Sequence, residues 1–233
     1  MMDSQKGIVK TAGLTYIIII VLGVLNSVFI DARLIIPGDI NQTVNNILAN
    51  QFLFRLGIAG SLILYLLVIV LSALLYLILK SVNKNIALSA LVFRTGEAII
   101  GVATVLAGFL VLNLLNHGFN RTDAQLNIIS TLLVARVDGL YIILALIGVG
   151  GTLFLYLFYK SSCIPAALSL WGMFTYLSML ILSFIVILFP GLPRIMALVV
   201  FGAGALFELS IGFWLLIKGV DPQKLNNNKV EIK

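Results

Sequence analysis

The sequence predicts an all-α integral membrane protein with six transmembrane helices. Of its 233 residues, 61% are hydrophobic and only 10% are charged, whereas an ordinary soluble domain has roughly 25% charged residues. The mean hydropathy of +1.14 is too high for one core to hide every apolar side chain, so some of them must face lipid. Apolar runs of about 20 residues, the length that lets a helix cross roughly 30 Å of hydrocarbon, occur six times.

In chain order, the predicted spans cover residues 11–30, 53–79, 88–115, 138–159, 165–189 and 195–217. Lys6 and Lys10 precede the first span as in a signal peptide, but no small-residue cleavage motif follows it, which predicts an uncleaved span. Residues 1–220 are expected to form a single six-helix domain. The asparagine-rich segment 221–233 lacks apolar periodicity and is expected to be a disordered tail.

Two connections, after the first and the third predicted span, are too long to be simple turns. Both lie on the side opposite the lysines, which is expected to be the outer side. In the first, Asp39 precedes Ile40, Val44 and Ile47, which recur at helical spacing. In the second, residues 122–125 have the pattern of a capping box. Each outer loop is therefore expected to contain a short amphipathic helix that runs into the next span. Such helices lie at the membrane surface or, alternatively, form a lid over an outward-facing cavity.

The basic residues predict the orientation in the membrane. Every lysine falls on one side: Lys6, Lys10, Lys80, Lys84, Lys160, Lys218, Lys224, Lys229 and Lys233. Cationic loops stay in the cytoplasm, so both termini are expected to be cytoplasmic. The positive charges are scattered between spans rather than gathered on one face, which argues against a nucleic-acid partner and leaves the lipid bilayer as the predicted one.

The even-numbered spans resemble one another. Each begins with an arginine and ends with a lysine, at residues 55 and 80, 136 and 160, and 194 and 218. This pattern predicts three helical hairpins in parallel orientation, related by an axis along the membrane normal. The alternative is chance, because apolar helices have low sequence complexity and basic residues flank most spans.

Three ionisable residues fall well inside predicted spans, namely Arg94, Glu97 and Glu208. A buried charge costs at least about 2.5 to 3.5 kcal/mol at the middle of a membrane, so each needs a partner or a function. Arg94 follows Lys84 by ten residues and Glu208 precedes Lys218 by ten, which places both at the same depth, roughly 15 Å from these lysines. Glu97 is one turn beyond Arg94 on the same face, so the pattern predicts one arginine shared by two carboxylates.

This cluster has two interpretations. It ties the third span to the sixth, or it lines a polar site together with Asn26 and a tyrosine such as Tyr16, Tyr65 or Tyr176. In the second case the excess carboxylate attracts a small cationic solute or a proton. A third idea, an enzyme that acts on lipid with Glu97 or Glu208 as base, lacks a paired nucleophile, so no catalytic residue is assigned.

A second set of charges marks the outer boundary of the membrane: Asp31, Arg55, Arg136 and Asp138. Two acids and two bases at one depth are expected to form interfacial salt bridges, or else to line a vestibule.

The residue types that hold metals and cofactors are scarce. The single histidine, His117, lies in an outer loop and the single cysteine, Cys163, in an inner one. No zinc-ligand spacing, haem-ligating pair of histidines, mid-span lysine for a retinal Schiff base or nucleotide-binding glycine motif is present, so neither a metal nor a cofactor is predicted. The sequence does not specify the oligomeric state.

Several stretches resemble an uncharacterised prokaryotic membrane family, catalogued as domain of unknown function 4386. The resemblance rests on residues 12–16, on 35–39 with 45–49 and 53–55, on Arg94 to Glu97, and on Glu208 with 214–219, and it covers nearly the whole chain. It implies a small inner-membrane protein and no particular activity. Family members usually have Asp with His near the start of the fourth span, where this chain has Arg136 to Gly139. That departure weakens a metal or acid-base role for the outer charges.

Overall fold

The structure is a computed structural model that describes residues 2–189 and 194–227. These residues form helices and connecting turns, and no strand occurs among them. Six helices are long and apolar enough to cross a membrane: Gln5–Leu34, Gln51–Leu79, Lys84–Asn116, Asp123–Ser161, Ala166–Leu188 and Val199–Ile217. The predicted class, an all-helical membrane protein with six transmembrane helices, is therefore confirmed.

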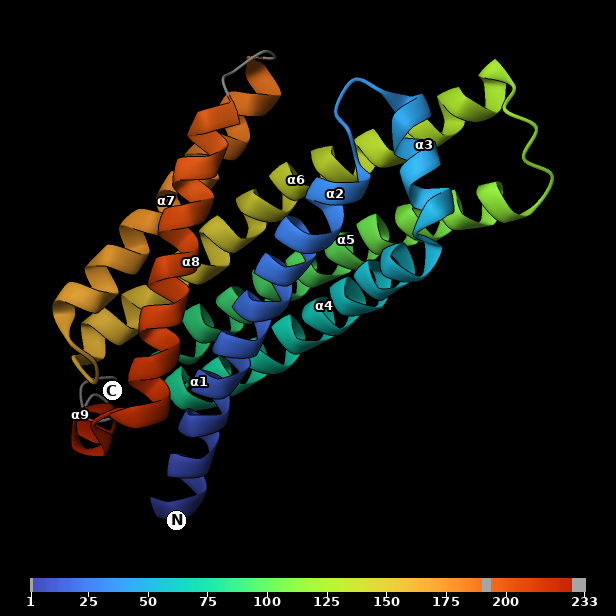
Figure 1. The fold of residues 1–233 in the computed structure, drawn as a ribbon. Helices are drawn as coiled ribbons and strands as arrows, with labels where there is room; N and C mark the ends of the chain where they lie inside the picture. The colour runs from blue at the N-terminus through green and yellow to red at the C-terminus, as the bar shows by residue number, and fades with distance from the viewer. Residues whose placement is uncertain (1, 190–193, 228–233) are drawn as a thin grey trace.

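The elements are, in order, α1 (Met2–Leu25), a π-helix η1 (Asn26–Asp31), α2 (Ala32–Leu34), α3 (Ile40–Ala49), α4 (Gln51–Leu79), α5 (Lys84–Asn116), α6 (Asp123–Ser161), α7 (Ala166–Leu188), α8 (Arg194–Ile217) and α9 (Pro222–Asn227). The long helices α4 to α8 pack in sequence order, and α1 packs against both α4 and α8 (Figure 1). The contact between α1 and α8 thus closes a ring of six helices.

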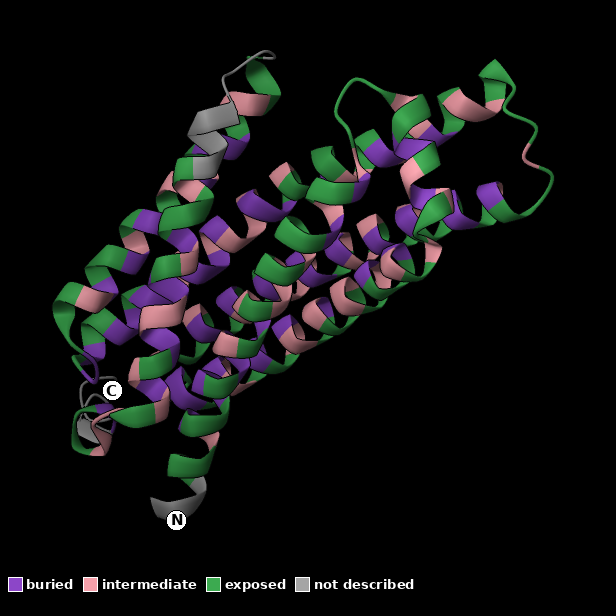
Figure 2. Cartoon of the chain, in the orientation of Figure 1, coloured by how far each residue is buried: buried purple, intermediate pink, exposed green. Residues whose placement is uncertain are grey.

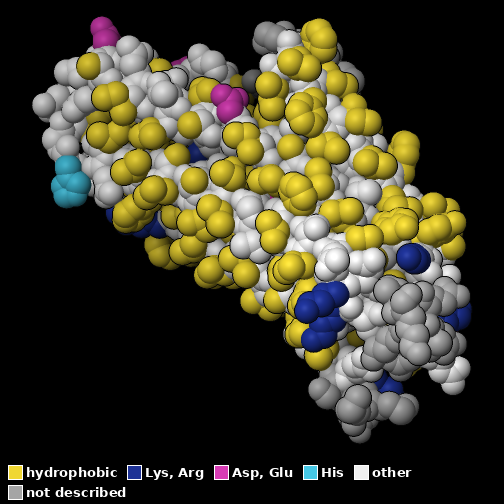
Figure 3. Space-filling model, turned by 180° about the vertical axis from the view of Figure 1, so that it is seen from behind, with side chains coloured by type: hydrophobic (Ala, Val, Ile, Leu, Met, Phe, Trp, Pro, Cys, Tyr) yellow, Lys and Arg dark blue, Asp and Glu magenta, His cyan; other side chains and the backbone are white. Residues whose placement is uncertain are grey.

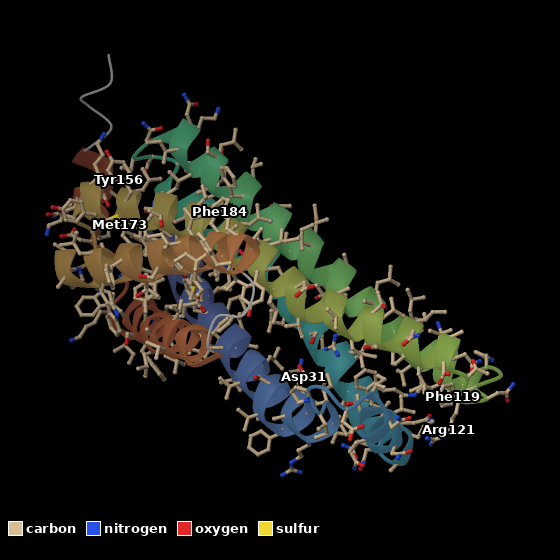
Figure 4. The ribbon with its side chains drawn as sticks, turned by 90° about the horizontal axis from the view of Figure 1, so that it is seen from above. Asp31, Phe119, Arg121, Tyr156, Met173 and Phe184 are labelled. Carbon is tan, nitrogen blue, oxygen red and sulfur yellow. The ribbon has the colours of Figure 1, made fainter. Side chains whose placement is uncertain are left out.

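One end of the bundle holds the start of α1 and the short helix α9 (Figure 1). Lys80, Lys84, Lys160 and Lys218 lie at helix termini there, and we call it the lysine end. The opposite end holds α3 and the α5–α6 loop, which Figure 4 marks with Phe119 and Arg121. Arg121 Nη2 donates to Asn45 Oδ1 at 2.6 Å, so this loop is joined to α3.

Apolar side chains cover the outside of the bundle. On α7, the exposed residues Phe174, Ile181 and Leu188 recur every seven positions and therefore share one helix face. Buried residues lie on the helix faces that point inward (Figure 2), while hydrophobic side chains cover much of the surface between the two ends (Figure 3). A surface of this kind is stable only in lipid, so the protein is a multi-pass membrane protein.

Polar side chains set where helices begin. The carboxylate of Asp39 accepts from Gln42 N at 2.8 Å, and the hydroxyl of Thr122 accepts from Gln125 N at 3.3 Å. Each satisfies a backbone donor that has no partner within the helix. From Thr122 onward α6 continues without a break for 39 residues, about 58 Å, which is longer than the hydrocarbon core. It therefore tilts or extends beyond the membrane, and the predicted fourth span, 138–159, is the second part of this longer helix.

The first span contains a π-helical segment, Asn26–Asp31, near the end opposite the lysines. Asn26 Nδ2 donates to Gly57 O at 3.0 Å and to Ser61 Oγ at 2.8 Å, and both acceptors lie on α4. Segments of this type interrupt α-helices at single turns, often near functional sites. Here the polar side chain of Asn26 finds its partners on the neighbouring helix.

The tail from residue 221 is not wholly disordered, contrary to the expectation from its composition. Asp221 N donates to Cys163 O at 3.0 Å, Pro222–Asn227 forms α9, and Leu225 is only 2% exposed. The apolar contact of Leu225 anchors a segment whose overall composition is polar. Residues 228–233 lie outside the described residues.

The single cysteine lies in the turn between α6 and α7. Cys163 is 4% exposed, and its Sγ accepts from Ser161 Oγ at 3.1 Å. Burial raises the pKa of the Cys163 thiol to about 11, and the hydrogen bond from Ser161 offsets only part of that increase. Because the thiolate is the reactive form, this cysteine is expected to react slowly with maleimides at neutral pH.

We therefore expect maleimide labelling of Cys163 at pH 7.5 to be about a hundredfold slower than labelling of an exposed cysteine, Lys84→Cys in a Cys163→Ser background. The rate for Cys163 should rise about tenfold per pH unit up to about pH 10, since each unit below the pKa reduces the thiolate tenfold. The rate for the exposed cysteine should level off above about pH 8.5. Mass-spectrometric time courses in detergent measure both rates, and equal rates at pH 7.5 would show that the thiol is neither buried nor protonated.

Candidate functional site

Two charged side chains lie on one face of α5 inside the bundle. Arg94 and Glu97 are both 3% exposed, and Arg94 Nη1 lies 2.6 Å from Glu97 Oε2. The spacing of three residues brings the two groups together on one helix face. The atoms are close enough for an ion pair, but neither has a well-oriented hydrogen-bond partner among the described residues. The attraction is therefore that of two charges, and hydrogen-bonding capacity is left over at both groups.

A third buried charge lies on α8. Glu208 is 7% exposed, and its Oε1 accepts a hydrogen bond of 2.8 Å from the Tyr176 hydroxyl on α7. The Tyr176 ring meets Phe207 edge-on, with ring centroids 5.5 Å apart. This packing fixes the ring, and the hydroxyl joins α7 to α8 through the carboxylate.

Tyr16 brings α1 to the same place. It is 4% exposed, its side chain neighbours Tyr176, and it interacts electrostatically with Arg94 and both carboxylates. We call Tyr16, Arg94, Glu97, Tyr176 and Glu208 the buried polar cluster. Its members come from α1, α5, α7 and α8, so most of the ring of helices converges on it.

Glycines on α6 make room for this cluster. A Cβ atom at Gly150 would lie 2.9 Å from Arg94 Cγ, and one at Gly151 would lie 2.5 Å from Tyr176 Cδ2. Both distances are too short for a real side chain. The absence of a Cβ therefore lets α6 pack directly over two cluster side chains, which is the close packing that small residues permit in membranes.

The expected sharing of Arg94 by two carboxylates is observed for Glu97 only. Among the described residues, no ion pair within 4.0 Å joins Arg94 to Glu208, although Arg94 is the charged group that acts on Glu208 most strongly. Of the predicted companions, Tyr16 and Tyr176 lie in the cluster. Asn26 instead donates hydrogen bonds to Gly57 and Ser61 on α4. It lies in the π-helical segment, which the hydrophobic pattern did not predict.

Tyr65, the remaining candidate tyrosine, lies beside the cluster rather than in it. It lies directly over Gly101, one turn from Glu97 on α5, and interacts electrostatically with Glu97. Its side chain also neighbours Thr104. Tyr65 therefore packs on α5 next to the buried polar cluster, on the side of Glu97 away from the lysine end.

Of the four charges predicted at the membrane boundary, only Arg136 and Asp31 form an ion pair. Arg136 Nη2 lies 3.6 Å from Asp31 Oδ1, and the guanidinium sits 5.7 Å from the centre of the Phe54 ring. Figure 4 shows Asp31 near the end of its helical run, away from Tyr156 and Met173. Arg55 and Asp138 are exposed, and neither forms an ion pair with any described residue. Arg136 thus joins three segments of the bundle, whereas the other two charges face outward.

The buried polar cluster can hold charge but offers little for other chemistry. With both carboxylates ionised it has one positive and two negative groups, hence an excess negative charge. Its two tyrosine hydroxyls both donate and accept hydrogen bonds, so they can pass a proton to or from Glu208. Within the part of the chain that the structure covers, no group of three or more His, Cys, Asp or Glu side chains is placed to hold a metal ion.

The fold and this cluster define a multi-pass membrane protein with ionisable side chains enclosed by its transmembrane helices. The family model described as Domain of unknown function (DUF4386) matches residues 11–219, and the chain belongs to that family. No curated protein and no solved structure matches the chain.

Proposed function

We propose that this protein binds or translocates a small solute or ion, most simply a proton or a monovalent cation, at the buried polar cluster. One observation supports the proposal: the one ion pair that the described residues form in the cluster lies within a single helix, and a further carboxylate is buried beside it. An ion pair within α5 does not tie two helices together. An excess carboxylate inside a membrane lowers stability, and ionisable groups at such positions usually mark a functional site.

The cluster is closed in this conformation, since Arg94, Glu97 and Glu208 are at most 7% exposed. A cation reaches it only if helices move apart. A proton needs less movement, because the Tyr176 hydroxyl already donates to Glu208 and the side chain of Tyr16 neighbours Tyr176. The proposal includes the orientation from the lysines, with both termini in the cytoplasm of a prokaryotic cell.

A structural role is the second candidate, favoured by the hydrogen bond between Tyr176 and Glu208. That bond joins α7 to α8 and is buried. In this case the charges stabilise the bundle or its assembly with other proteins, and nothing passes through it.

Proteoliposomes distinguish the two candidates. The wild type is reconstituted into liposomes that contain a pH-sensitive dye, and a potassium diffusion potential is imposed. Proton flux is then measured in two buffers, one with sodium and one with choline, so that a dependence on sodium can be detected. Glu208→Gln is expected to reduce the flux at least tenfold, because glutamine neither exchanges a proton nor attracts a cation. Tyr176→Phe should slow it, since the phenyl ring keeps the packing and removes the hydroxyl.

Asp138→Asn is the matched control, because it also neutralises a carboxylate, but an exposed one. It should leave the flux unchanged. Each variant must elute as a folded protein in detergent before reconstitution. If folded Glu208→Gln conducts as the wild type does, the cluster is not the site. A wild type with no flux in either salt, and no cation-dependent change of its melting temperature, would favour the structural role.

A further inference from the structure

A cavity of about 280 Å³ lies at the lysine end, between the start of α1 and the turn from α8 to α9. Three lysines line it: Lys6, Lys10 and Lys218. Buried apolar side chains, among them Val9 and Leu225, form the rest of its wall. The cavity shares no residue with the buried polar cluster, so it needs a separate explanation.

The charged side chains that line this cavity are all lysines. Among the residues that the structure describes, no aspartate or glutamate lines it, and none of the three lysines forms an ion pair with a described side chain. Lys6 and Lys10 are four residues apart on α1, a spacing at which like charges repel each other. The fold also places Lys218 from the far end of the chain against the same hollow. Such an arrangement is favourable when an anion lies between the ammonium groups.

The position of the cavity indicates the kind of anion. It lies where α1, α4 and α8 leave the apolar part of the surface, and dark-blue basic side chains gather at this end in Figure 3. Next to the lysines along the chain, Ile217 is 71% exposed and Leu14 is 48% exposed. A ligand with its anionic group among the lysines can therefore rest an apolar chain on neighbouring helix surface.

We propose that this cavity binds the phosphate group of an anionic ligand, and that a phospholipid with a negatively charged headgroup supplies it. Ammonium groups bind phosphate as point charges. The apolar wall can contact the glycerol region of a lipid. A soluble phosphate has no apolar part that would make this contact. Because this site uses no residue of the buried polar cluster, the proposal stands independently of the proposed ion-binding function.

Native mass spectrometry of the whole protein in a non-ionic detergent tests it. Phosphatidylglycerol is titrated into the wild type, with phosphatidylcholine and inorganic phosphate as parallel arms. The wild type should retain one phosphatidylglycerol more tightly than phosphatidylcholine. The triple variant Lys6→Gln, Lys10→Gln, Lys218→Gln should bind it up to about a hundredfold more weakly, since each lysine near an anionic lipid contributes roughly fivefold.

The triple variant Lys80→Gln, Lys84→Gln, Lys160→Gln is the matched control, because it removes the same charge from the same end of the bundle outside the cavity. It should bind phosphatidylglycerol as the wild type does. Unchanged melting temperatures without lipid show that both variants fold. Equal losses in the two triple variants, or equal binding of the two lipids by the wild type, would overturn the proposal. Competition by millimolar inorganic phosphate would assign the site to a soluble phosphate and overturn the lipid as its source.

Discussion

Replacing Arg94 by methionine is expected to lower the free energy of unfolding by roughly 3–5 kcal/mol, because it leaves the buried carboxylate of Glu97 without its counter-charge. The double variant Arg94→Met, Glu97→Met should recover most of that loss. Buried ion pairs replaced by apolar side chains of similar volume are often neutral for stability. Denaturant titration in mixed micelles of the wild type, both single variants and the double variant gives the coupling energy directly.

Arg55→Met is the matched control, since Arg55 is exposed and forms no ion pair with a described residue. Its effect should stay within about 0.5 kcal/mol. A second cycle, between Arg94 and Glu208, should show weaker coupling, because these two groups do not form an ion pair. If the double variant Arg94→Met, Glu97→Met is as unstable as Arg94→Met, the guanidinium stabilises the bundle through other contacts and the local ion pair is incidental.

Replacing Gly13 by alanine should destabilise the protein by about 1–3 kcal/mol, as overpacking does elsewhere. A Cβ atom at Gly13 would lie 2.5 Å from Leu216 N and 2.6 Å from Gly212 O, both backbone atoms of α8. Backbone cannot swing aside as a flexible side chain does, so α1 and α8 would have to separate. The same denaturant titration measures the loss.

Gly7→Ala provides the control on the same helix. Apart from the backbone of its own helix and its chain neighbours, no described atom lies within 4 Å of the Cβ position at Gly7, and alanine favours helix over glycine by up to about 1 kcal/mol. This variant should therefore be neutral or slightly stabilising. Two alanine substitutions six residues apart are thus expected to have opposite signs. Equal effects would mean that α1 and α8 do not approach each other this closely.

The spans could be predicted from the sequence because about 20 apolar residues in a row permit few alternatives to a transmembrane helix. The caps at Asp39 and Thr122 were legible for a similar reason, since a side chain that accepts from a nearby backbone N–H acts locally. The matching depth of Arg94 and Glu208 followed from counting residues along regular helices.

What the sequence did not reveal depends on how each helix is rotated. Arg136 and Asp138 are two residues apart and point to nearly opposite sides of α6, so only one of them can face Asp31. Counting depth alone treated them as equivalent. The predicted ion pair between Arg94 and Glu208 is not observed among the described residues. Counting depth did not show that the guanidinium points to Glu97 on its own helix.

The helix α9 was missed although a local signal was present. Asp221 Oδ1 accepts from Gln223 N at 3.0 Å, and Pro222 occupies the first helical position, where its missing N–H costs nothing. The asparagine-rich composition of residues 221–233 led to the prediction of a disordered tail in spite of this signal. The orientation of the bundle, the three-hairpin repeat and the surface or lid position of the outer helices stay predictions.

The closed ring also has a consequence for how the protein is made. The neighbour that completes the packing of α1 is α8, which is the last of these six helices in chain order and is therefore synthesised after the other five. Until then the face of α1 around Gly13 has no partner from α8, and contacts between such distant parts of a chain form late. Biosynthesis that stops before α8 therefore leaves an open arc of five helices in which that face of α1 stays uncovered.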